Sequence, residues 1–318
     1  MTDIVQPPMR IGIVGLGKIA QKAYLPILAT RADVVPVLCT RDETTLGRLC
    51  RQYRVTDACS QVEELSAMDI DAAFVHTATV AHMEVAGRLI ESGIDVYLDK
   101  PLAYSLEESK QLIELAKANG CKLMIGFNRR FAPLYSRIAA QPERRLILMQ
   151  KNRVGLADYA RRVIFDDFIH VIDTLRFLMG AEMSTLTVSS FIDRGLLHQV
   201  MIRLEGRNVT AVGLMNRDSG MTEEILEVMA PGEKWVVKDL DVMHHFSTGI
   251  ESRMTFEGWD TVLHRRGFPQ IIDHFLTSVR EGSYPRISAD DALATHAFCE
   301  RIVDELEGQG AKSWTIRS

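Results

Sequence analysis

Hydrophobic positions follow different patterns in the two halves of the chain. From residue 9 to about residue 127, short and nearly continuous apolar runs alternate with segments of helical periodicity, such as residues 81–92 and 106–119. The apolar runs, each expected to form a strand, are RIGIVG (10–15), VVPVLCT (34–40), AAFVHTA (72–78), IDVYLD (94–99) and CKLMIGF (121–127). Apolar strands that alternate with helices are typical of a parallel sheet covered on both faces. The pattern predicts a doubly wound α/β domain over residues 1–127.

Strand-like runs with period-2 or mixed patterning dominate the chain beyond residue 127. They are RLILMQ (145–150), TLTVSSF (185–191), HQVMIRLEG (198–206), VTAVGLM (209–215), EILEVMA (224–230), KWVVKDL (234–240) and SRMTFEG (252–258). Helical stretches are expected at 166–178, 269–281 and 289–306. Such runs favour an antiparallel sheet. The pattern predicts an α+β domain over residues 128–318 with a large, mostly antiparallel open sheet, and we expect the two C-terminal helices to pack back on the first domain.

Length, composition and charge are those of an ordinary globular protein. The 318 residues suffice for two domains with separate cores, and 47% of them are hydrophobic and 25% charged. A net charge of −5 argues against a nucleic-acid partner. The five cysteines lack metal-ligand spacing, and His244 and His245 lack companion ligands, so we expect reduced thiols, a surface histidine pair and no metal site. Without an apolar signal core or a membrane-length apolar run, a cytoplasmic location and no membrane partner are expected.

A glycine pattern joins the first expected strand to a helix. RIGIVG continues into LGKIA, so that Gly15, Gly17 and Ala20 form G-x-G-x-x-A, with Lys18 and Ile19 between them. Gly15 would allow the tight turn, Gly17 the close approach of backbone to a pyrophosphate, and Ala20 the packing of helix on strand. The phosphates would lie at the helix N-terminus. The first domain is therefore expected to be a Rossmann domain that binds a nicotinamide dinucleotide.

The end of the second strand indicates which dinucleotide is preferred. An acid about 20 residues past the glycines would bind the ribose 2′-hydroxyl of NAD. The strand instead ends in Thr40 and Arg41, whose hydroxyl and guanidinium suit the 2′-phosphate of NADP. Asp42, one place later, could still reach the ribose. The sequence favours NADP over NAD and leaves NAD open.

A lysine stands where the fourth expected strand stops, in VYLDKPLA (96–103). The next segment has the boundary signals of a helix, a capping box that starts at Ser105 and a glycine at position 120. Lys100 therefore lies in a strand-to-helix connection at the carboxyl edge of the sheet, where ligands of such sheets bind. Its ammonium could polarise a substrate oxygen or pass a proton to it, and Asp99 could orient a polar group of ligand or backbone.

These motifs resemble those of the Gfo/Idh/MocA oxidoreductases over nearly the whole chain. The glycine loop, DKP in place of that family's E-K-P, and DDFIHVIDTLRFLMG (166–180) in place of its D-x-G-x-H-x-x-D segment occur in the family's order. GLGKIAQKAYLPIL, VHTATVAH, DKPLA and IGFNRRFAPLY are similar to the MviM-like branch in particular. The resemblance implies a homodimer through the second-domain sheet. It also implies hydride transfer between a nicotinamide and the carbinol or carbonyl carbon of a small polyol, sugar or cyclitol.

The resemblance further implies that Lys100, Asp166 and His170 are the catalytic residues. Oxidation of an alcohol requires a base near the hydroxyl proton, and histidine has a suitable pKa at neutral pH. Asp166 precedes His170 by four residues and would share its helix face, and Asp173 could orient the histidine or contact substrate. Asp167 is an equally good carboxylate by composition, and only the spacing and the resemblance prefer Asp166.

The sequence departs from the family's pattern around the substrate pocket. Phe168 replaces a glycine, residues 162–165 replace a glycine-rich stretch, and HTAT (76–79) lacks the family's proline. These departures leave two further hypotheses open. One is an enzyme of the same fold that acts on a trans-dihydrodiol or an enone, and the other is a non-catalytic cofactor-binding regulator or scaffold.

Other polar residues near strand ends are candidates for contacts with cofactor or substrate. His76, Thr77 and His82 follow the third strand and could touch the nicotinamide ribose or simply fill the loop. Asn128 and Arg129 follow the fifth strand. An arginine there could bind the cofactor or an anionic substrate group, or it could bridge the two domains.

Overall fold

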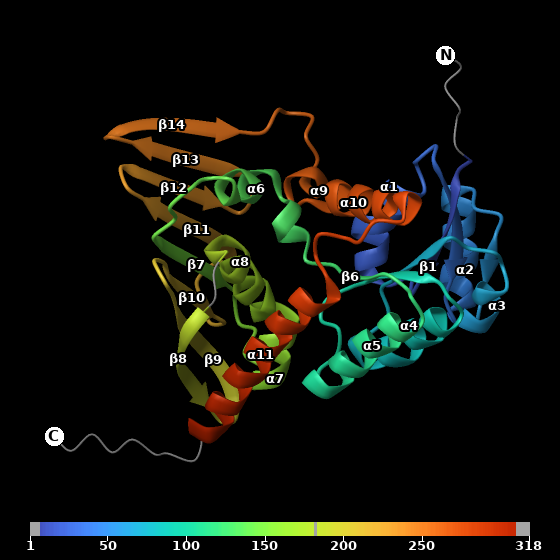
Figure 1. Ribbon diagram of the computed structural model, residues 1–318, viewed down its shortest axis with the longest axis horizontal. Coiled ribbons are helices and arrows are strands. Elements are labelled where there is room, and N and C mark those ends of the chain that lie inside the picture. Colours follow the sequence, from blue (N-terminus) through green and yellow to red (C-terminus); the bar gives the residue numbers. More distant parts are fainter. Residues whose placement is uncertain (1–6, 181–182, 310–318) are drawn as a thin grey trace. The chain divides into compact units, whose positions relative to one another are not determined.

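The computed structural model describes residues 7–180 and 183–309, and Figure 1 shows its helices and strands. The chain divides by its internal contacts into two compact units. The first contains Met1–Gly126 and Ile271–Leu293, and the second contains Phe127–Gln270 and Ala294–Ser318. The first crossing from one unit to the other therefore falls after Gly126, and a segment from near the C-terminus is counted with the first unit.

The first unit is built on a six-stranded parallel sheet with the strand order β3-β2-β1-β4-β5-β6. Its strands are β1 (Met9–Val14), β2 (Val34–Cys39), β3 (Ala58–Cys59), β4 (Ala72–Val75), β5 (Asp95–Leu98) and β6 (Leu123–Ile125). This order is that of a Rossmann fold. Strands β2 and β3 are added on one side of β1, and strands β4 to β6 on the other, so the order of strands reverses between β1 and β4. The predicted doubly wound domain is confirmed, with β3 as a short strand that the apolar pattern did not indicate.

Helices connect these strands in the first unit. They are η1 (Ala20–Tyr24), α1 (Leu25–Leu28), α2 (Glu43–Tyr53), α3 (Val62–Ser66), η2 (Thr79–Ala81), α4 (His82–Glu91), α5 (Leu106–Ala118) and most of α10 (Phe268–Glu281). The Ser105 hydroxyl caps α5 by accepting a hydrogen bond from the backbone nitrogen of Glu108 at 3.2 Å, as expected. Gly120 follows α5 with φ +68°, a conformation that favours glycine. Figure 1 shows α4 and α5 running side by side.

An aromatic layer covers one face of this sheet. Phe74 on β4 and Tyr97 on β5 are paired in register and stack with ring centroids 4.7 Å apart. Phe275 of α10 meets the Phe74 ring edge-on at 5.3 Å, and Tyr24 of η1 lies 5.6 Å from Tyr97. Because all four side chains are buried, the layer holds the carboxyl ends of β4 and β5 rigidly.

The second unit contains an eight-stranded sheet with the order β14-β13-β12-β11-β7-β10-β9-β8. Its strands are β7 (Leu146–Asn152), β8 (Met183–Asp193), β9 (Leu196–Gly206), β10 (Thr210–Asn216), β11 (Glu223–Ala230), β12 (Glu233–Lys238), β13 (Val242–Ser247) and β14 (Ile250–Thr255). Among the described strands of this second sheet, only β7 and β10 pair in parallel, so the prediction of a mostly antiparallel sheet is confirmed. The sequence did not indicate β13, because its HHF stretch lacks a clear alternation.

The helices of the second unit precede, cover or follow this sheet. They are η3 (Asn128–Phe131), α6 (Pro133–Ala139), α7 (Ala160–Val163), η4 (Ile164–Phe168), α8 (Ile169–Met179), α9 (Val262–Arg265) and the greater part of α11 (Ala289–Gln309). The predicted start of a helix near Asp166 was wrong, because helical structure begins at Ala160 and passes through the π-helical turn η4. Gly213 of β10 gives α8 room, since a Cβ there would lie 2.6 Å from Val171. None of the described helices combines the length and apolarity needed to cross a bilayer.

Candidate functional site

The glycine loop connects β1 to the first helix and leaves space for a ligand. Gly15 has φ +83°, and a Cβ on it would lie 2.6 Å from the backbone nitrogen of Thr77 and 2.8 Å from the carbonyl carbon of His76. No atom lies within 4 Å of the position that a Cβ on Gly17 would occupy. Gly15 is therefore required by the protein itself, whereas Gly17 keeps open a space that the protein does not fill.

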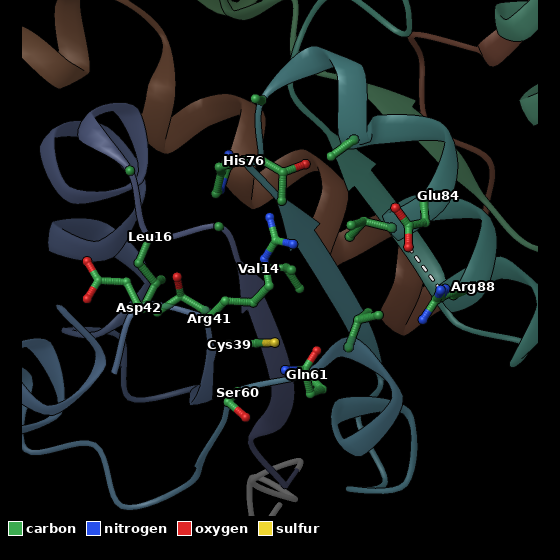
Figure 2. Close-up of a pocket in the computed structure, with 18 of the residues that line it drawn as sticks. Val14, Leu16, Cys39, Arg41, Asp42, Ser60, Gln61, His76, Glu84 and Arg88 are labelled. Atoms are coloured by element: carbon green, nitrogen blue, oxygen red, sulfur yellow. Dashed lines mark hydrogen bonds and ion pairs between the residues drawn. The ribbon is translucent and has the colours of Figure 1, made fainter. Parts of the chain in front are cut away.

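A pocket of about 490 Å³ lies within the first unit at the carboxyl ends of β1, β2 and β4 (Figure 2). Its lining brings together seven residues singled out in the sequence: Gly15, Gly17, Thr40, Arg41, Asp42, His76 and Thr77. Lys18 and Ile19 are exposed at the start of the helix and are not part of the lining, and Ala20 is buried beneath it. The pocket has the size and the position expected of a dinucleotide site in a doubly wound sheet.

Arg41 is an uncompensated cation at this pocket. Its side chain extends into the pocket in Figure 2, and it forms no hydrogen bond or ion pair with any described residue. Arg88, another arginine of the lining, is by contrast paired with Glu63 and with Glu84 at 2.9 Å. The guanidinium of Arg41 is therefore available to a phosphate.

Asp42 serves as the N-cap of α2. One carboxylate oxygen accepts a hydrogen bond from the backbone nitrogen of Thr45 at 3.1 Å, and the other accepts one from the Thr45 hydroxyl at 2.6 Å. Both interactions lower the pKa of Asp42. The carboxylate that might have served the ribose of NAD is therefore engaged at the helix start.

Asp99, directly after β5, contacts His76 and Tyr24 of the aromatic layer. Its Oδ2 lies 2.8 Å from Nδ1 of His76, and its Oδ1 accepts a hydrogen bond from the Tyr24 hydroxyl at 3.1 Å. The Tyr24 and Tyr97 hydroxyls are 2.9 Å apart. Burial alone would raise the pKa of Asp99, but the nearby His76 and Lys100 lower it below its ordinary value. Lys100 follows Asp99 and is half-buried.

His82 has a structural position. Its ring lies between backbone carbonyls, with Nδ1 2.8 Å from Pro101 O and Nε2 3.1 Å from Thr77 O. Burial lowers the pKa of His82. The side chain thus links the connection after β4 to the connection after β5. These contacts favour the loop-filling role for His82 over a contact with the nicotinamide ribose.

The second unit carries the other candidate catalytic residues. Asp166 lies in η4 and His170 in the first turn of α8, and both are half-buried. Phe165, which precedes Asp166, and Phe168, which lies between the two residues, are buried. Asp167 is held by Arg153, whose Nε and Nη2 each lie 2.7 Å from a carboxylate oxygen. Burial raises the pKa of Asp167, but the Arg153 hydrogen bonds and nearby cations lower it overall.

A buried charge cluster surrounds Glu224 on β11. Arg129 forms two hydrogen bonds to its carboxylate at 2.9 and 2.6 Å, Lys151 of β7 lies at 3.0 Å, and the Tyr135 hydroxyl donates at 3.1 Å. Burial alone would raise the pKa of Glu224, yet Arg129 and Lys151 lower it far below its ordinary value. Burial, and then the Arg129 guanidinium, lower the pKa of Lys151 to about 8. Arg129 thus has its ion pair inside the second unit.

Asp173 and Asn128 are likewise engaged by neighbours in the second unit. Arg130 contacts both carboxylate oxygens of Asp173, with Nε 2.9 Å from Oδ2 and Nη2 2.5 Å from Oδ1, and the Thr295 hydroxyl donates to it at 3.1 Å. The Asn128 amide donates to the carbonyl of Arg266 at 2.8 Å. Asp173 is about 1% exposed, so these contacts account for its burial as a charged group.

Sequence reasoning missed several polar side chains of these networks. They are Tyr24 and Tyr97 around Asp99, and Lys151, Arg153 and Glu224 in the second unit. Tyr97 could have been found, because residues two apart on a strand share a face and Tyr97 therefore faces the same side as Asp99. The contacts of Glu224 join residues up to 95 positions apart, and no local pattern indicates them.

The described residues contain no group of three or more His, Cys, Asp and Glu side chains that could hold a metal ion. The five cysteines are free thiols. His244 and His245 lie in β13, where His244 contacts Glu251 and His245 contacts Glu233 and stacks on Trp235.

Comparisons with known proteins agree with this architecture. The family model described as an oxidoreductase family with an NAD-binding Rossmann fold, GFO_IDH_MocA, matches residues 9–127, and that of the YceM-like C-terminal domain matches residues 133–248. YceM of Salmonella typhimurium is 31% identical over 94% of this chain and 97% of its own. The dehydrogenase MviM of Clostridium difficile, a solved structure, is 31% identical with a TM-score of 0.90 and covers 93% of this chain and 99% of its own.

A more distant relative carries a name that states a substrate. Inositol 2-dehydrogenase of Rhizobium meliloti is 23% identical over 93% of this chain and 96% of its own length. The two family models together span both units, and the similarity to YceM extends over nearly the whole chain. The protein therefore belongs to the Gfo/Idh/MocA oxidoreductase family and to its MviM-like branch.

Proposed function

We propose that the protein is an NADP-preferring oxidoreductase that transfers a hydride between the nicotinamide and the carbinol or carbonyl carbon of a small polyol, sugar or cyclitol. The observation that carries the proposal is the pocket at the ends of β1, β2 and β4. It combines a glycine loop, whose Gly17 borders open space, with the unpaired Arg41. When bound there, the dinucleotide would supply the hydride donor or acceptor.

The preference for NADP rests on the end of β2. Arg41 has no partner among the described residues, and a guanidinium that faces a pocket suits a 2′-phosphate. Asp42, the acid that could have favoured NAD, uses both carboxylate oxygens to cap α2. Thr40 lines the same pocket and offers a hydroxyl to the ligand.

We assign the proton transfer and the charge stabilisation at the substrate oxygen to Lys100, Asp166 and His170. His170 would accept the hydroxyl proton during oxidation, and the Lys100 ammonium would stabilise negative charge on the same oxygen. Asp166 is preferred over Asp167 as the carboxylate beside the histidine, because Asp167 is committed to Arg153 and Arg217. The ion pairs of Arg129 and Asp173 favour structural roles for these two residues over substrate binding.

A polyol or cyclitol is the substrate class that the relatives favour, since inositol 2-dehydrogenase matches nearly the whole chain. We further propose that the protein is a homodimer formed through the sheet of the second unit. Phe191 of β8 and Met201 of β9 are exposed apolar residues on this sheet and border a groove of about 350 Å³. Light scattering of the purified protein tests the dimer, and a monomer at micromolar concentration would contradict it.

A parallel titration with NADPH and NADH, followed by nicotinamide fluorescence, tests the cofactor and with it the reaction class. NADPH should bind more tightly, and Arg41→Asp should abolish that preference. Arg88→Ala is the matched control, because Arg88 lines the same pocket but is neutralised by Glu63 and Glu84. Binding of neither dinucleotide would rule out the oxidoreductase and favour a regulator or scaffold.

A substrate panel then tests the second half of the proposal. Polyols and cyclitols with NADP, and the corresponding ketones with NADPH, are compared with a trans-dihydrodiol and an enone. Turnover of the last two alone would replace the proposed substrate class while leaving the cofactor assignment intact. Unchanged turnover in both Lys100→Ala and His170→Ala would contradict the catalytic assignment.

A further inference from the structure

His76 carries a buried nitrogen that the protein leaves without a partner. The residue is 5% exposed, and its Nε2 forms no hydrogen bond with any described residue. The hydroxyl of Thr77, the next residue, is also buried without a partner. A buried polar atom without a hydrogen bond costs about 1–3 kcal/mol, so two of them on consecutive residues of a pocket lining require an explanation.

The other ring nitrogen of His76 is fixed by Asp99. A carboxylate only accepts hydrogen bonds, and therefore Nδ1, 2.8 Å from Asp99 Oδ2, carries a proton. In the neutral ring with this tautomer, Nε2 carries a lone pair and can accept a hydrogen bond. The ring also packs against Tyr24, with the ring centroids 3.9 Å apart, which restricts its movement.

Asp99 has no oxygen left without a partner, since His76 occupies Oδ2 and Tyr24 donates to Oδ1. Tyr97 supports this arrangement through its hydroxyl, 2.9 Å from that of Tyr24. Gly126 makes room for it, since a Cβ there would lie 2.7 Å from the Tyr97 hydroxyl oxygen and 3.2 Å from Asp99 Oδ1. Each oxygen of Asp99 is therefore held by one of these side chains, and Asp99 can act on a ligand through His76.

The strand order identifies which half of a dinucleotide lies near His76. The glycine loop follows β1 and Arg41 follows β2, so the phosphates and the adenosine half belong to the β1–β2 side. β4 and β5 lie on the other side of β1, beyond the point where the strand order reverses. His76 after β4 and Asp99 after β5 therefore belong to the nicotinamide half.

We propose that His76, held by Asp99, binds the nicotinamide half of the cofactor by accepting at Nε2 a hydrogen bond from a ribose hydroxyl or from the carboxamide amino group. Asp99 is a positioning residue that keeps the proton on Nδ1. Because solvent does not reach Nε2 in this structure, the proposal includes a small shift of the side chains over the ring when the ligand binds. The inference rests on the proposed function, since it requires a dinucleotide in the pocket.

The test compares binding of the whole dinucleotide with binding of its adenosine half. His76→Asn is the informative variant, because its amide nitrogen can replace Nδ1 and donate to Asp99 while nothing replaces Nε2. Titrations use NADPH with 2′,5′-ADP, or NADH with 5′-AMP if NADH binds more tightly. His76→Asn should weaken dinucleotide binding at least tenfold and leave binding of the adenosine half and the melting temperature nearly unchanged.

Dinucleotide binding by His76→Asn within twofold of the wild type, or an equal loss for both ligands, would overturn the assignment. In either case the wild type still binds the dinucleotide and the proposed function stands. A wild type that binds neither ligand would overturn both. The two failures are thus distinguishable.

Nitrogen-15 NMR of histidine-labelled protein gives a second measurement that does not depend on how the variant folds. In the wild type the His76 ring should carry its proton on Nδ1, and the dinucleotide, but not its adenosine half, should shift the Nε2 resonance. Asp99→Asn should weaken the preference of the proton for Nδ1, because an amide can donate to that nitrogen as well as accept from it. The proposal would be contradicted if the dinucleotide left the Nε2 chemical shift unchanged, or if the wild-type ring carried its proton on Nε2 alone.

Discussion

Arg153 holds both carboxylate oxygens of Asp167, through Nε and Nη2 at 2.7 Å each. Arg217 approaches the same carboxylate at 3.0 Å and Lys151 at 3.6 Å. Asp166, its neighbour in η4, is half-buried and is the carboxylate that we assign to the reaction. The proposed function thus divides the tasks between two adjacent acids that composition alone does not distinguish.

Amide substitutions should separate these two tasks. Asp167→Asn leaves Arg153 and Arg217 without their carboxylate and should lower the free energy of unfolding by about 2 kcal/mol or more. Asp166→Asn should reduce kcat by about a hundredfold, because it removes a charged partner of the proton transfer. Urea denaturation and turnover on a substrate from the panel measure the two effects. The reverse pattern would assign the chemistry to Asp167.

The two glycines of the loop should respond differently to alanine. Gly15→Ala should destabilise the first unit by several kcal/mol, because its Cβ would lie 2.6 Å from the Thr77 nitrogen at a φ of +83°. Gly17→Ala meets no protein atom and should leave the melting temperature unchanged, while NADPH affinity falls at least tenfold. Full NADPH binding by Gly17→Ala would show that the space beside Gly17 is not where the cofactor lies.

Asp42 offers a test of the choice between NADP and NAD. If its only task is to cap α2, Asp42→Ala should lower the free energy of unfolding by about 1 kcal/mol and leave the ratio of NADPH to NADH affinity unchanged. A selective loss of NADH binding would instead show that the carboxylate reaches the ribose. Denaturation and the fluorescence titration on the same variant decide between these outcomes.

Much of the fold could be predicted because its signals are local. The apolar runs, the Ser105 cap and the glycine loop are encoded within a few residues of one another, and all of them form as expected. The helix expected to start near Asp166 was misplaced, because Ala160–Phe168 follows its tertiary contacts through a π-helical turn. The alternation rule also missed β13, whose residues are mostly half-buried.

The site could be predicted only to the level of its residue types. The sequence placed His76, Asp99 and Arg41 at strand ends, and the order of parallel strands fixes that edge. It could not show that Asp99 is bound on both oxygens or that Arg129 pairs with Glu224, because those partners lie 23 to 95 positions away. Long-range pairing of this kind depends on packing and not on local pattern.

The buried Glu224 should be among the most sensitive positions of the second unit. Glu224→Gln removes the charge that compensates Arg129 and Lys151, and should lower the free energy of unfolding by about 3–5 kcal/mol. Glu227→Gln, on the same strand, is the matched control, because its pair with Lys234 is partly exposed and should be worth less than about 1 kcal/mol. Fluorescence of Trp235, buried in β12, can follow unfolding of this unit. Equal effects of the two variants would mean that the buried cluster adds nothing beyond a surface pair.

The same cluster should make stability rise with pH in two separate ranges. The pKa of Glu224 is lowered in the folded state, so its contribution is present above about pH 4.3, the ordinary value for glutamate, and is lost as the pH falls through the folded pKa. The pKa of Lys151 is lowered to about 8, so the unfolded chain binds more protons between about pH 8 and about pH 10.4, and stability rises with pH there.

Glu224→Gln should flatten the acidic decline. It should also start the alkaline rise at a lower pH, because Glu224 raises the pKa of Lys151 in the wild type. Urea unfolding of wild type and variant across this range measures both slopes, and identical pH profiles would show that Glu224 and Lys151 do not interact as the 3.0 Å contact indicates.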